Sequence, residues 1–512
     1  MKFFLFFTNI SGGKLAKKSR KEYNDTIMKK TNENIIDDEA AVAERERKQF
    51  DKMTKSPIAR LIIGLGIPTT LSMMVTSLYN LADTYFVSRI GDDAITAAAS
   101  NLLALMSIIQ AIGFTFGMGS GALISRLLGK RDREGADKVF SSSLFVSFVC
   151  GLLVFLMGFA FFEPMLRLLG SKAADVLEYS KQYAVWILIA APFMCMSFVL
   201  NNVLRAEGKA VLSMIGLVVG AVVNVILDPI LIFAADMGIS GAAIATCASQ
   251  LLSFAILLFM FLSGKTIIRF RIRSISRKFG VYAEVISTGF PSFCRQVLAS
   301  LCTVFLNGAA FDCGVLHYGT EEGGKAAQAA LGVVQKVFML AFSMSLGIGQ
   351  GYQPVLGYNY SAKKYERVKS AYLFTLGFSV CVMSVFAIVC GIFSPFVMKL
   401  FSLSSEATEI GALALRLQCI CMPLLPLNFM ASITYQSLGK KAIASLLSVS
   451  RQGLFYIPSV LILPKVLGLF GVQSCQAISD LLAFFFAIPF TVMFFNMLKR
   501  EQAQRDAKTL QE

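Results

Sequence analysis

Two carboxylates stand inside long apolar segments of this sequence, where a charged group is costly. Asp228 follows Asn224 by four residues, so a carboxylate and an amide share one helical face. Asp83 stands near the end of another apolar segment, one turn after Tyr79. A carboxylate at the middle of a bilayer costs about 2.5–3.5 kcal/mol even on lenient scales, so each one asks for an explanation. The structural explanation is that Asp228 caps a helix end beside Pro229 and that Asp83 lies at the membrane interface.

The functional explanation is ion binding. Oxygen ligands of this type suit a hard cation, and a carboxylate withdrawn from water equally suits a proton. The sequence contains a single histidine, His317, so no histidine cluster for a metal site is expected. The segment Gly264-Lys265-Thr266 resembles the end of a phosphate-binding loop, but Phe259 stands where that motif requires glycine. We therefore expect no cofactor and no enzymatic activity, and we expect energy to come from a gradient of H⁺ or Na⁺.

The segments that hold these residues are long enough to cross a membrane. Apolar residues make up 55% of the chain, Phe alone numbers 44, and charged residues are 16%, against roughly 25% in soluble domains. Apolar runs such as residues 58–81, 139–161 and 211–233 reach or approach the ~20 residues that a membrane helix needs. Backbone groups in lipid must be satisfied within the segment. The sequence thus predicts an all-α polytopic membrane protein with about twelve transmembrane helices.

The net charge of +16 does not indicate nucleic-acid binding, because the basic residues sit in short turns without interleaved aromatic residues. They concentrate in alternate turns, and by the positive-inside rule those turns, together with both termini, are expected in the cytoplasm. These basic residues are Arg126, Lys130, Arg131, Arg133 and Lys138; Arg205 and Lys209; Lys265, Arg269, Arg271, Arg273, Arg277 and Lys278; Lys363, Lys364, Arg367 and Lys369; and Lys440 and Lys441.

The two halves of the chain repeat each other. Equivalent residues recur at a nearly constant distance, and Pro192 and Pro423, for example, are 231 residues apart. With an even number of spans in each half, the halves have the same orientation, so we expect two parallel six-helix repeats around a central cleft. Other matched sets are Pro68 and Pro291; Gly117, Gly119 and Gly121 with Gly347, Gly349 and Gly351; Gly208 and Gly439; and Gly238 and Gly241 with Gly468 and Gly471.

This repeat divides the chain into five parts. They are a polar cytoplasmic tail (1–57), disordered or loosely helical; an N-terminal six-helix bundle with the cation site (58–264); a basic cytoplasmic linker (265–279); a C-terminal six-helix bundle (280–498); and a cytoplasmic tail (499–512).

The second half does not repeat the acidic residues. At the distance set by the prolines, Asn224 and Asp228 fall on Phe455 and Ser459, so ion coupling is expected in the first half only. The second half instead places Arg295 and Arg451 in its spans. A buried arginine needs a partner, and Asp480 is a candidate for Arg451. Structural pairing is the first explanation for both arginines, and a role towards substrate is the second.

Several motifs follow one another along the chain. They are LYNLADTYFV (78–87), SRLLGK (125–130), RAEG (205–208), SMIG (213–216), NVILDPILIF (224–233), GAAIAT (241–246), GQGYQP (349–354) and GYN (357–359). Taken together and in this order, they resemble those of the MATE (multidrug and toxic compound extrusion) transporters, over about residues 56–500. The resemblance implies two six-helix bundles and efflux of drugs in exchange for protons or sodium. It also implies a cation site at Asp83, Asn224, Asp228 and Thr246, as in the bacterial branch that keeps this site in the first half. The other branch has an acidic site in the second half, where this chain has Arg295 instead.

A cleft rich in Phe and Met, near carboxylates, suits amphipathic and often cationic drugs or toxins. We expect a monomer in the bacterial plasma membrane, with the lipid bilayer and small molecules as its partners and no nucleic acid. The candidate residues for substrate contact are Tyr79, Met73, Phe116, Arg295, Met344, Gln353 and Tyr435.

Three alternatives stay open at this point. A flippase for lipid-linked oligosaccharides has a related architecture, and Arg295 and Arg451 favour it because such a cleft needs cations for pyrophosphate. Asn224, Asp228 and Thr246 argue against it. A dedicated exporter of one metabolite fits the same residues as a multidrug pump. A channel predicts leak without exchange, which a one-sided acidic site in a two-bundle repeat does not favour.

Overall fold

The computed structural model describes residues 42–90, 93–171, 173–401 and 404–509, which are helical apart from their connections and contain no strand. The chain forms two units, Met1–Lys52 and Met53–Glu512. In the first unit, residues 42–52 are helical. The rest of the predicted disordered or loosely helical tail before residue 42 lies outside the described residues. Everything below concerns the second unit.

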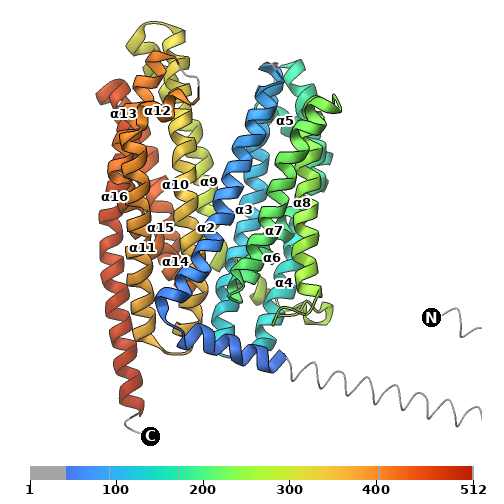
Figure 1. Ribbon diagram of the computed structural model, residues 1–512, viewed down its shortest axis with the longest axis vertical. Helices are drawn as coiled ribbons and strands as arrows, with labels where there is room; N and C mark the ends of the chain where they lie inside the picture. The colour runs from blue at the N-terminus through green and yellow to red at the C-terminus, as the bar shows by residue number, and fades with distance from the viewer. Residues whose placement is uncertain (1–41, 91–92, 172, 402–403, 510–512) are drawn as a thin grey trace, which may run out of the picture. The chain divides into compact units, whose positions relative to one another are not determined.

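The first bundle contains six long helices (Figure 1). Pro57 precedes its first helix, and Asp132 caps a later one by accepting a hydrogen bond from the backbone N–H of Gly135 (2.8 Å). The helices are α2 (Ile58–Ser88), α3 (Asp93–Gly129), α4 (Arg133–Ala160), the short α5 (Phe162–Leu168), α6 (Ala174–Ala206), α7 (Ala210–Pro229) with the π-helical η1 (Ile230–Ala234), and α8 (Gly238–Leu262).

The second bundle follows a linker that includes the 3₁₀ turn η2 (Ile272–Ser274). Thr320 and Ser404 cap two of its helices through their side-chain oxygens. The helices are α9 (Phe279–Tyr318), α10 (Glu321–Ser361), α11 (Tyr365–Ile392), the short α12 (Ser394–Lys399), α13 (Ser405–Cys421) joined through η3 (Met422–Leu424) to α14 (Leu425–Ser437), α15 (Lys441–Val449) with the π-helical η4 (Ser450–Tyr456), and α16 (Ile457–Thr509).

Eleven stretches of the described chain are long and apolar enough to cross a membrane, and the last of them, Lys441–Ala507, contains two helices. Gly468, with φ 57° and ψ −134°, separates them, a backbone conformation that residues with a side chain rarely adopt. The described residues therefore provide the twelve helical crossings that the sequence predicts, and this chain is an all-α, multi-pass membrane protein.

The two bundles share backbone features at matched positions. Gly208 and Gly439, which each end a helix, have the same φ of 78°. Gly238 has φ 53°, close to the 57° of Gly468, the residue with which it pairs in the sequence repeat. A left-handed glycine follows the end of a helix at Gly208 and Gly439, whereas Gly238 is the first residue of α8 and Gly468 separates the two helices within α16. The sequence repeat is therefore also a repeat of local structure.

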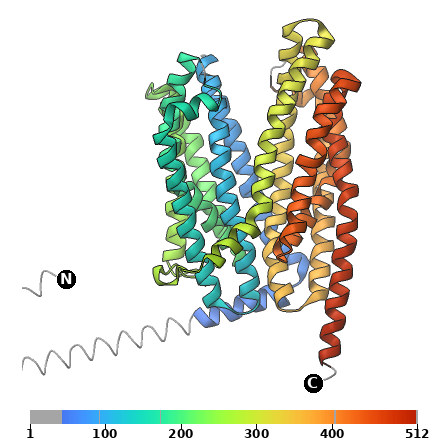
Figure 2. The same cartoon turned by 180° about the vertical axis from the view of Figure 1, so that it is seen from behind.

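Glycines also set how closely the bundles approach. A side chain at Gly119 of α3 would collide with the backbone of Val285 in α9, and one at Gly347 of α10 would collide with the backbone of Thr70 in α2. Small residues of this kind allow helix backbones to pack closely. Figures 1 and 2 show that the ribbons of the two bundles lie close at the end where α3, α8 and α10 finish, and that they diverge towards the other end. We call the first of these the basic end, because it carries the basic turns.

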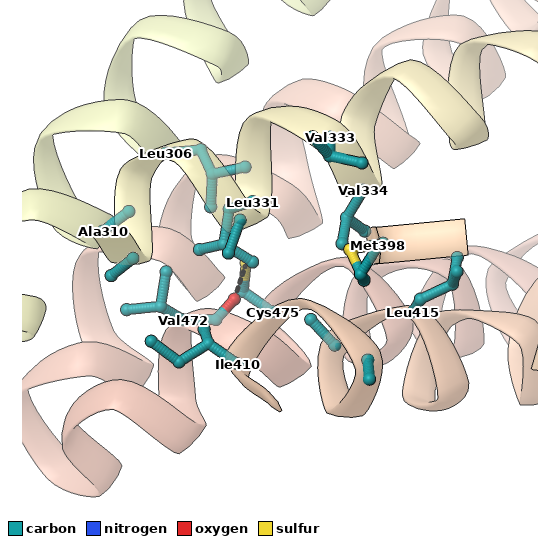
Figure 3. Packing of buried hydrophobic residues seen from close by; sticks show 14 of the residues in the cluster. Leu306, Ala310, Leu331, Val333, Val334, Met398, Ile410, Leu415, Val472 and Cys475 are labelled. Atoms are coloured by element: carbon teal, nitrogen blue, oxygen red, sulfur yellow. Dashed lines mark hydrogen bonds between the residues drawn. The ribbon is translucent and has the colours of Figure 1, made fainter. Parts of the chain in front are cut away.

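Each bundle has an apolar core of its own. In the first bundle it includes Leu102, Ile187 and Ala242, and in the second it includes Leu331, Ile410 and Val472 (Figure 3). The outward faces are apolar too, as the half-exposed side chains of Leu153 and Val385 illustrate. Apolar side chains on both the inside and the outside are expected when lipid surrounds the protein.

Candidate functional site

Three of the predicted cation ligands lie together between α7 and α8. The Nδ2 of Asn224 lies 3.4 Å from Asp228 Oδ1 and also 3.4 Å from Thr246 Oγ1. All three residues are buried, with at most 3% of each exposed. Glycine makes this proximity possible, because a side chain at Gly220 would collide with Ser253 of the facing helix. The amide, the carboxylate and the hydroxyl thus form one polar cluster inside the first bundle.

The fourth predicted ligand, Asp83, comes from α2, which packs against α7. Its carboxylate is close enough to that of Asp228 for the two to repel each other. Tyr79, one turn earlier on α2, accepts a hydrogen bond from Gln250 Nε2 of α8 at 3.4 Å. The structure therefore brings together Asp83, Asn224, Asp228 and Thr246, and it adds Tyr79 to their surroundings.

The cluster contains more acceptors than donors. Asp83 Oδ1, Asn224 Oδ1 and Asp228 Oδ2 are buried and accept no hydrogen bond in the described part of the chain. Among the described residues, neither carboxylate forms an ion pair. A buried carboxylate without a partner is strongly unfavourable, so such an oxygen set is completed by a bound hard cation or by protons on the carboxylates. In chemical terms, the arrangement can take up and release a small cation.

Two residues at the site were not singled out in the sequence. Gln250 follows Thr246 by four residues, so the two lie on one face of the helix, and this spacing could have predicted Gln250 at the site. Tyr183 of α6 is buried against Thr246 and lies near both carboxylates. Nothing local in the sequence marks Tyr183, because its position depends on how α6 packs against α8.

A helix irregularity accompanies the cluster. Directly after Asp228 and Pro229, the chain changes from α-helix to the π-helical segment η1. Proline removes a backbone donor, which weakens the regular ladder at this point. Such π-helical segments are frequent at functional sites, because they turn side chains and free backbone carbonyls within a helix.

The other candidates for substrate contact are spread over both bundles. Met73 of α2 and Phe116 of α3 are buried, and Met344 of α10 is half-buried. Gln353, also on α10, is buried with its Nε2 lacking an acceptor among the described residues. Tyr435 lies in the interior of the second bundle, where its hydroxyl donates to the carbonyl of Phe490 at 2.7 Å. These candidates therefore come from α2 and α3 of the first bundle and from α10 and α14 of the second.

The second bundle contains the predicted arginine pair. Arg451 Nε lies 2.7 Å from Asp480 Oδ1, which confirms the expected partner, and Gln476 Nε2 donates to the same oxygen. The guanidinium of Arg451 lies over the ring of Phe338 at 4.9 Å. Arg295 lies over the ring of Phe429 at 5.3 Å, and it forms no ion pair in the described part of the chain.

Comparisons with known proteins match nearly the whole chain. The MatE family model matches twice, at residues 68–230 and at residues 297–462, once in each bundle. Both matches together cover well over half of the chain, and the double match agrees with the internal repeat.

Relatives with curated descriptions and solved structures agree with this family match. The chain is 26% identical over 429 residues to "Multidrug export protein MepA" of Staphylococcus aureus (strain MSSA476), covering 83% of this chain and 91% of that protein. It is also 26% identical to the protein of the same name from Staphylococcus saprophyticus, covering 85% and 93%. A structure described as the outward-facing conformation of a multidrug resistance MATE family transporter superimposes with a TM-score of 0.82, at 26% identity, covering 88% and 98%. A structure described as MATE in the bent conformation has a TM-score of 0.80, at 26% identity, covering 89% and 99%.

Proposed function

Because the chain belongs to the MatE family, we propose that it is a secondary active exporter that exchanges H⁺ or Na⁺ for amphipathic drugs or toxic compounds, many of them cationic. Export of several compounds is suggested by the names of its relatives, which are multidrug export proteins. The identity of 26% extends over most of both chains, so the proposal concerns the whole protein and not one part of it.

The observation that carries this proposal is the polar cluster of the first bundle. The buried Asp228 and the partly buried Asp83 contribute two carboxylates without a cationic partner in the described part of the chain, and Asn224 adds an amide oxygen that is also unpartnered. Such a set favours binding of a small cation, because oxygen ligands replace the hydration shell of Na⁺ and a carboxylate accepts H⁺. The same helices bear no motif for a nucleotide, so a cation gradient is the energy source that this site can use.

In the mechanism that we propose, the two bundles give access to the site from alternate sides of the membrane. The positive-inside rule assigns the basic end, and with it both termini, to the cytoplasm of a bacterial cell. With the bundles in contact at that end, a cation enters from outside, and the exported compound leaves as the first bundle rearranges. One cation that moves in down a potential of 100 mV supplies ~2.3 kcal/mol, enough for a concentration ratio of roughly fiftyfold for a neutral compound.

Inverted membrane vesicles test this proposal. Vesicles that contain the protein are given a fluorescent cationic dye, and a pH gradient and a sodium gradient are imposed in separate experiments. Dye uptake that follows one of the gradients, and that vesicles without the protein lack, identifies an exchanger and its coupling ion. Dye movement that equilibrates without regard to either gradient would instead indicate a channel and would contradict the proposal.

A further inference from the structure

A small cavity inside the second bundle has two arginines in its wall. Arg295 from α9 and Arg451 from η4 line it, together with Phe342 and Phe429. Arg451 is only 7% exposed, and its Nη2 donates to nothing among the described residues. The Nη1 of Arg295 is likewise buried and has no acceptor. Each of the two guanidinium groups that line this cavity therefore has a nitrogen without an acceptor among the described residues.

The charges around this cavity do not balance. Arg451 is paired with Asp480 through its Nε, and Arg295 has no acidic partner in the described part of the chain. Two arginines and one aspartate leave one positive charge uncompensated. None of the residues that line the cavity is acidic. Arg451 is buried and Arg295 is partly buried, and a charge withdrawn from water without a counter-ion is unfavourable, so the cavity favours an anionic group.

The walls of the cavity define what kind of anion fits. The rings of Phe342 and Phe429 form part of the wall, and Arg295 lies over Phe429. The volume of about 20 Å³ holds about one water-sized atom, such as a single carboxylate oxygen, so the rest of a bound molecule must lie outside the cavity. A water molecule would accept hydrogen bonds from the guanidinium groups but would leave the positive charge uncompensated. The acid group of an amphipathic compound would satisfy the charge and also contact the aromatic rings.

The cavity adjoins the contact between the bundles. Gln296, the neighbour of Arg295, lies 3.5 Å from Gln110 of the first bundle. Ser343, the neighbour of Phe342, hydrogen-bonds to Ser77 of α2. The cavity is therefore one residue along α9 and one residue along α10 from contacts between the bundles. Arg451 also lies on a π-helical segment, and such segments are frequent at functional sites.

We infer that Arg295 and Arg451 form an anion-binding pocket that takes the carboxylate of an exported amphipathic compound. This inference rests on the proposed export function and refines its substrate class. The best substrates then carry an acid group in addition to their cationic nitrogen, because the second bundle offers guanidinium groups to that acid.

A matched pair of dyes tests the pocket directly. Rhodamine B and its methyl ester share one cationic ring system and differ in a single carboxylate. Their binding to the purified protein is measured by fluorescence anisotropy, so the test needs no ion gradient. A hydrogen bond to a charged group discriminates by about tenfold or more, so wild type should bind the acid at least tenfold more tightly than the ester. Arg295→Gln should remove that preference. Arg416→Gln, which alters an exposed arginine on α13 of the same bundle, should keep it.

The possible results separate this inference from the proposed function. Equal binding of the two dyes by wild type, or an unchanged preference in Arg295→Gln, would overturn the pocket and leave the export function standing. If chloride stabilised dye-free wild type against heat, but not Arg295→Gln, and the dyes bound equally, the anion would be a free inorganic ion and the substrate assignment would be wrong. Failure of both dyes to bind wild type would contradict the export of such dyes, and the inference would fall with it.

Discussion

The two bundles share a backbone plan and differ in the sign of their buried charge. Gly208 and Gly439 make the same turn, with φ 78° in both. Yet the first bundle buries Asp228 and one carboxylate oxygen of Asp83 without a cationic partner among the described residues, whereas the second contains the partly buried Arg295 without an acidic partner among them. Glycines in turns and at helix contacts determine the path of the chain, and the polar side chains inside each bundle are free to diverge. One architecture thus carries unpaired carboxylates in one half and an unpaired arginine in the other, among the described residues.

The largest expected difference between the bundles concerns stability. Asp480→Asn removes the partner of Arg451 and leaves a buried guanidinium unpaired, which should cost about 3–5 kcal/mol. Asp228→Asn removes a carboxylate that has no cationic partner among the described residues, so it should leave stability unchanged or raise it. Thermal unfolding of the purified variants measures both. Equal loss of stability in the two variants would show that the contrast in pairing is wrong.

A second prediction concerns the contact between the bundles. Gly347→Ala places a methyl group against the backbone of Thr70, and overpacking of this kind costs about 1–3 kcal/mol. The cost applies to the arrangement in which the basic ends touch, so the population should shift away from it. Fluorescence transfer between labels on non-natural residues at positions 130 and 440 reports their distance. Gly332→Ala is the control on the same helix, because nothing lies within 4 Å of its new side chain, and an equal shift in that variant would contradict the prediction.

Within the first bundle, Thr246→Val should weaken cation coupling moderately. The change keeps the shape but removes the hydroxyl that Asn224 approaches at 3.4 Å. The loss of one neutral hydrogen-bonding ligand is worth about 1 kcal/mol, so the cation concentration for half-maximal uptake should rise about fivefold. Thr246→Ser retains the hydroxyl and should stay near wild type. Equal cation dependence in Thr246→Val and wild type would exclude the hydroxyl from the site.

The smallest effect is expected at the rim of the basic end. Oε1 of Glu284, on α9, lies 4.0 Å from Nη2 of Arg126 in the first bundle and 3.9 Å from Nζ of Lys441. The side chain of Glu284 is 52% exposed. Exposed pairs of this kind contribute about 0–1 kcal/mol and weaken in salt. Glu284→Gln should therefore change the distance between the labels at 130 and 440 only slightly, and only at low salt. Glu163→Gln, whose partners Arg167 and Lys181 lie in its own bundle, should not change it. A large effect that persists in high salt would contradict this assignment.

Much of this fold can be read from local patterns. Apolar runs predicted the helices, and the sequence repeat matched Gly468 with Gly238. In the structure, Gly468 separates the two helices within α16. The four-residue spacing of Asn224 and Asp228 predicted their shared face, because the geometry of a helix is independent of its neighbours. Thr246 was implied only by the family resemblance, and the structure places it beside Asn224.

The features of the site that the sequence did not predict depend on contacts between helices. Tyr183 approaches the first-bundle cluster only because α6 packs against α8. The cavity beside Arg295 requires α9, α14 and η4 to meet, and no spacing along the chain encodes that meeting. Tyr435 is a polar residue in an apolar helix and was a candidate for substrate contact. In the structure, its hydroxyl is hydrogen-bonded to the carbonyl of Phe490 in the interior of the second bundle. Residue type alone does not separate a polar group that faces a substrate from one that satisfies a neighbouring helix.

The central claim is that the first-bundle cluster couples the cation to export and does not merely hold the compound. The most direct test measures Asp228→Asn twice, once for equilibrium binding of a cationic dye and once for dye uptake into inverted vesicles under an imposed proton or sodium gradient. We predict that dye binding survives and that gradient-driven uptake is lost under both gradients. Gradient-driven uptake at the wild-type rate in Asp228→Asn would contradict the claim and place the coupling site elsewhere.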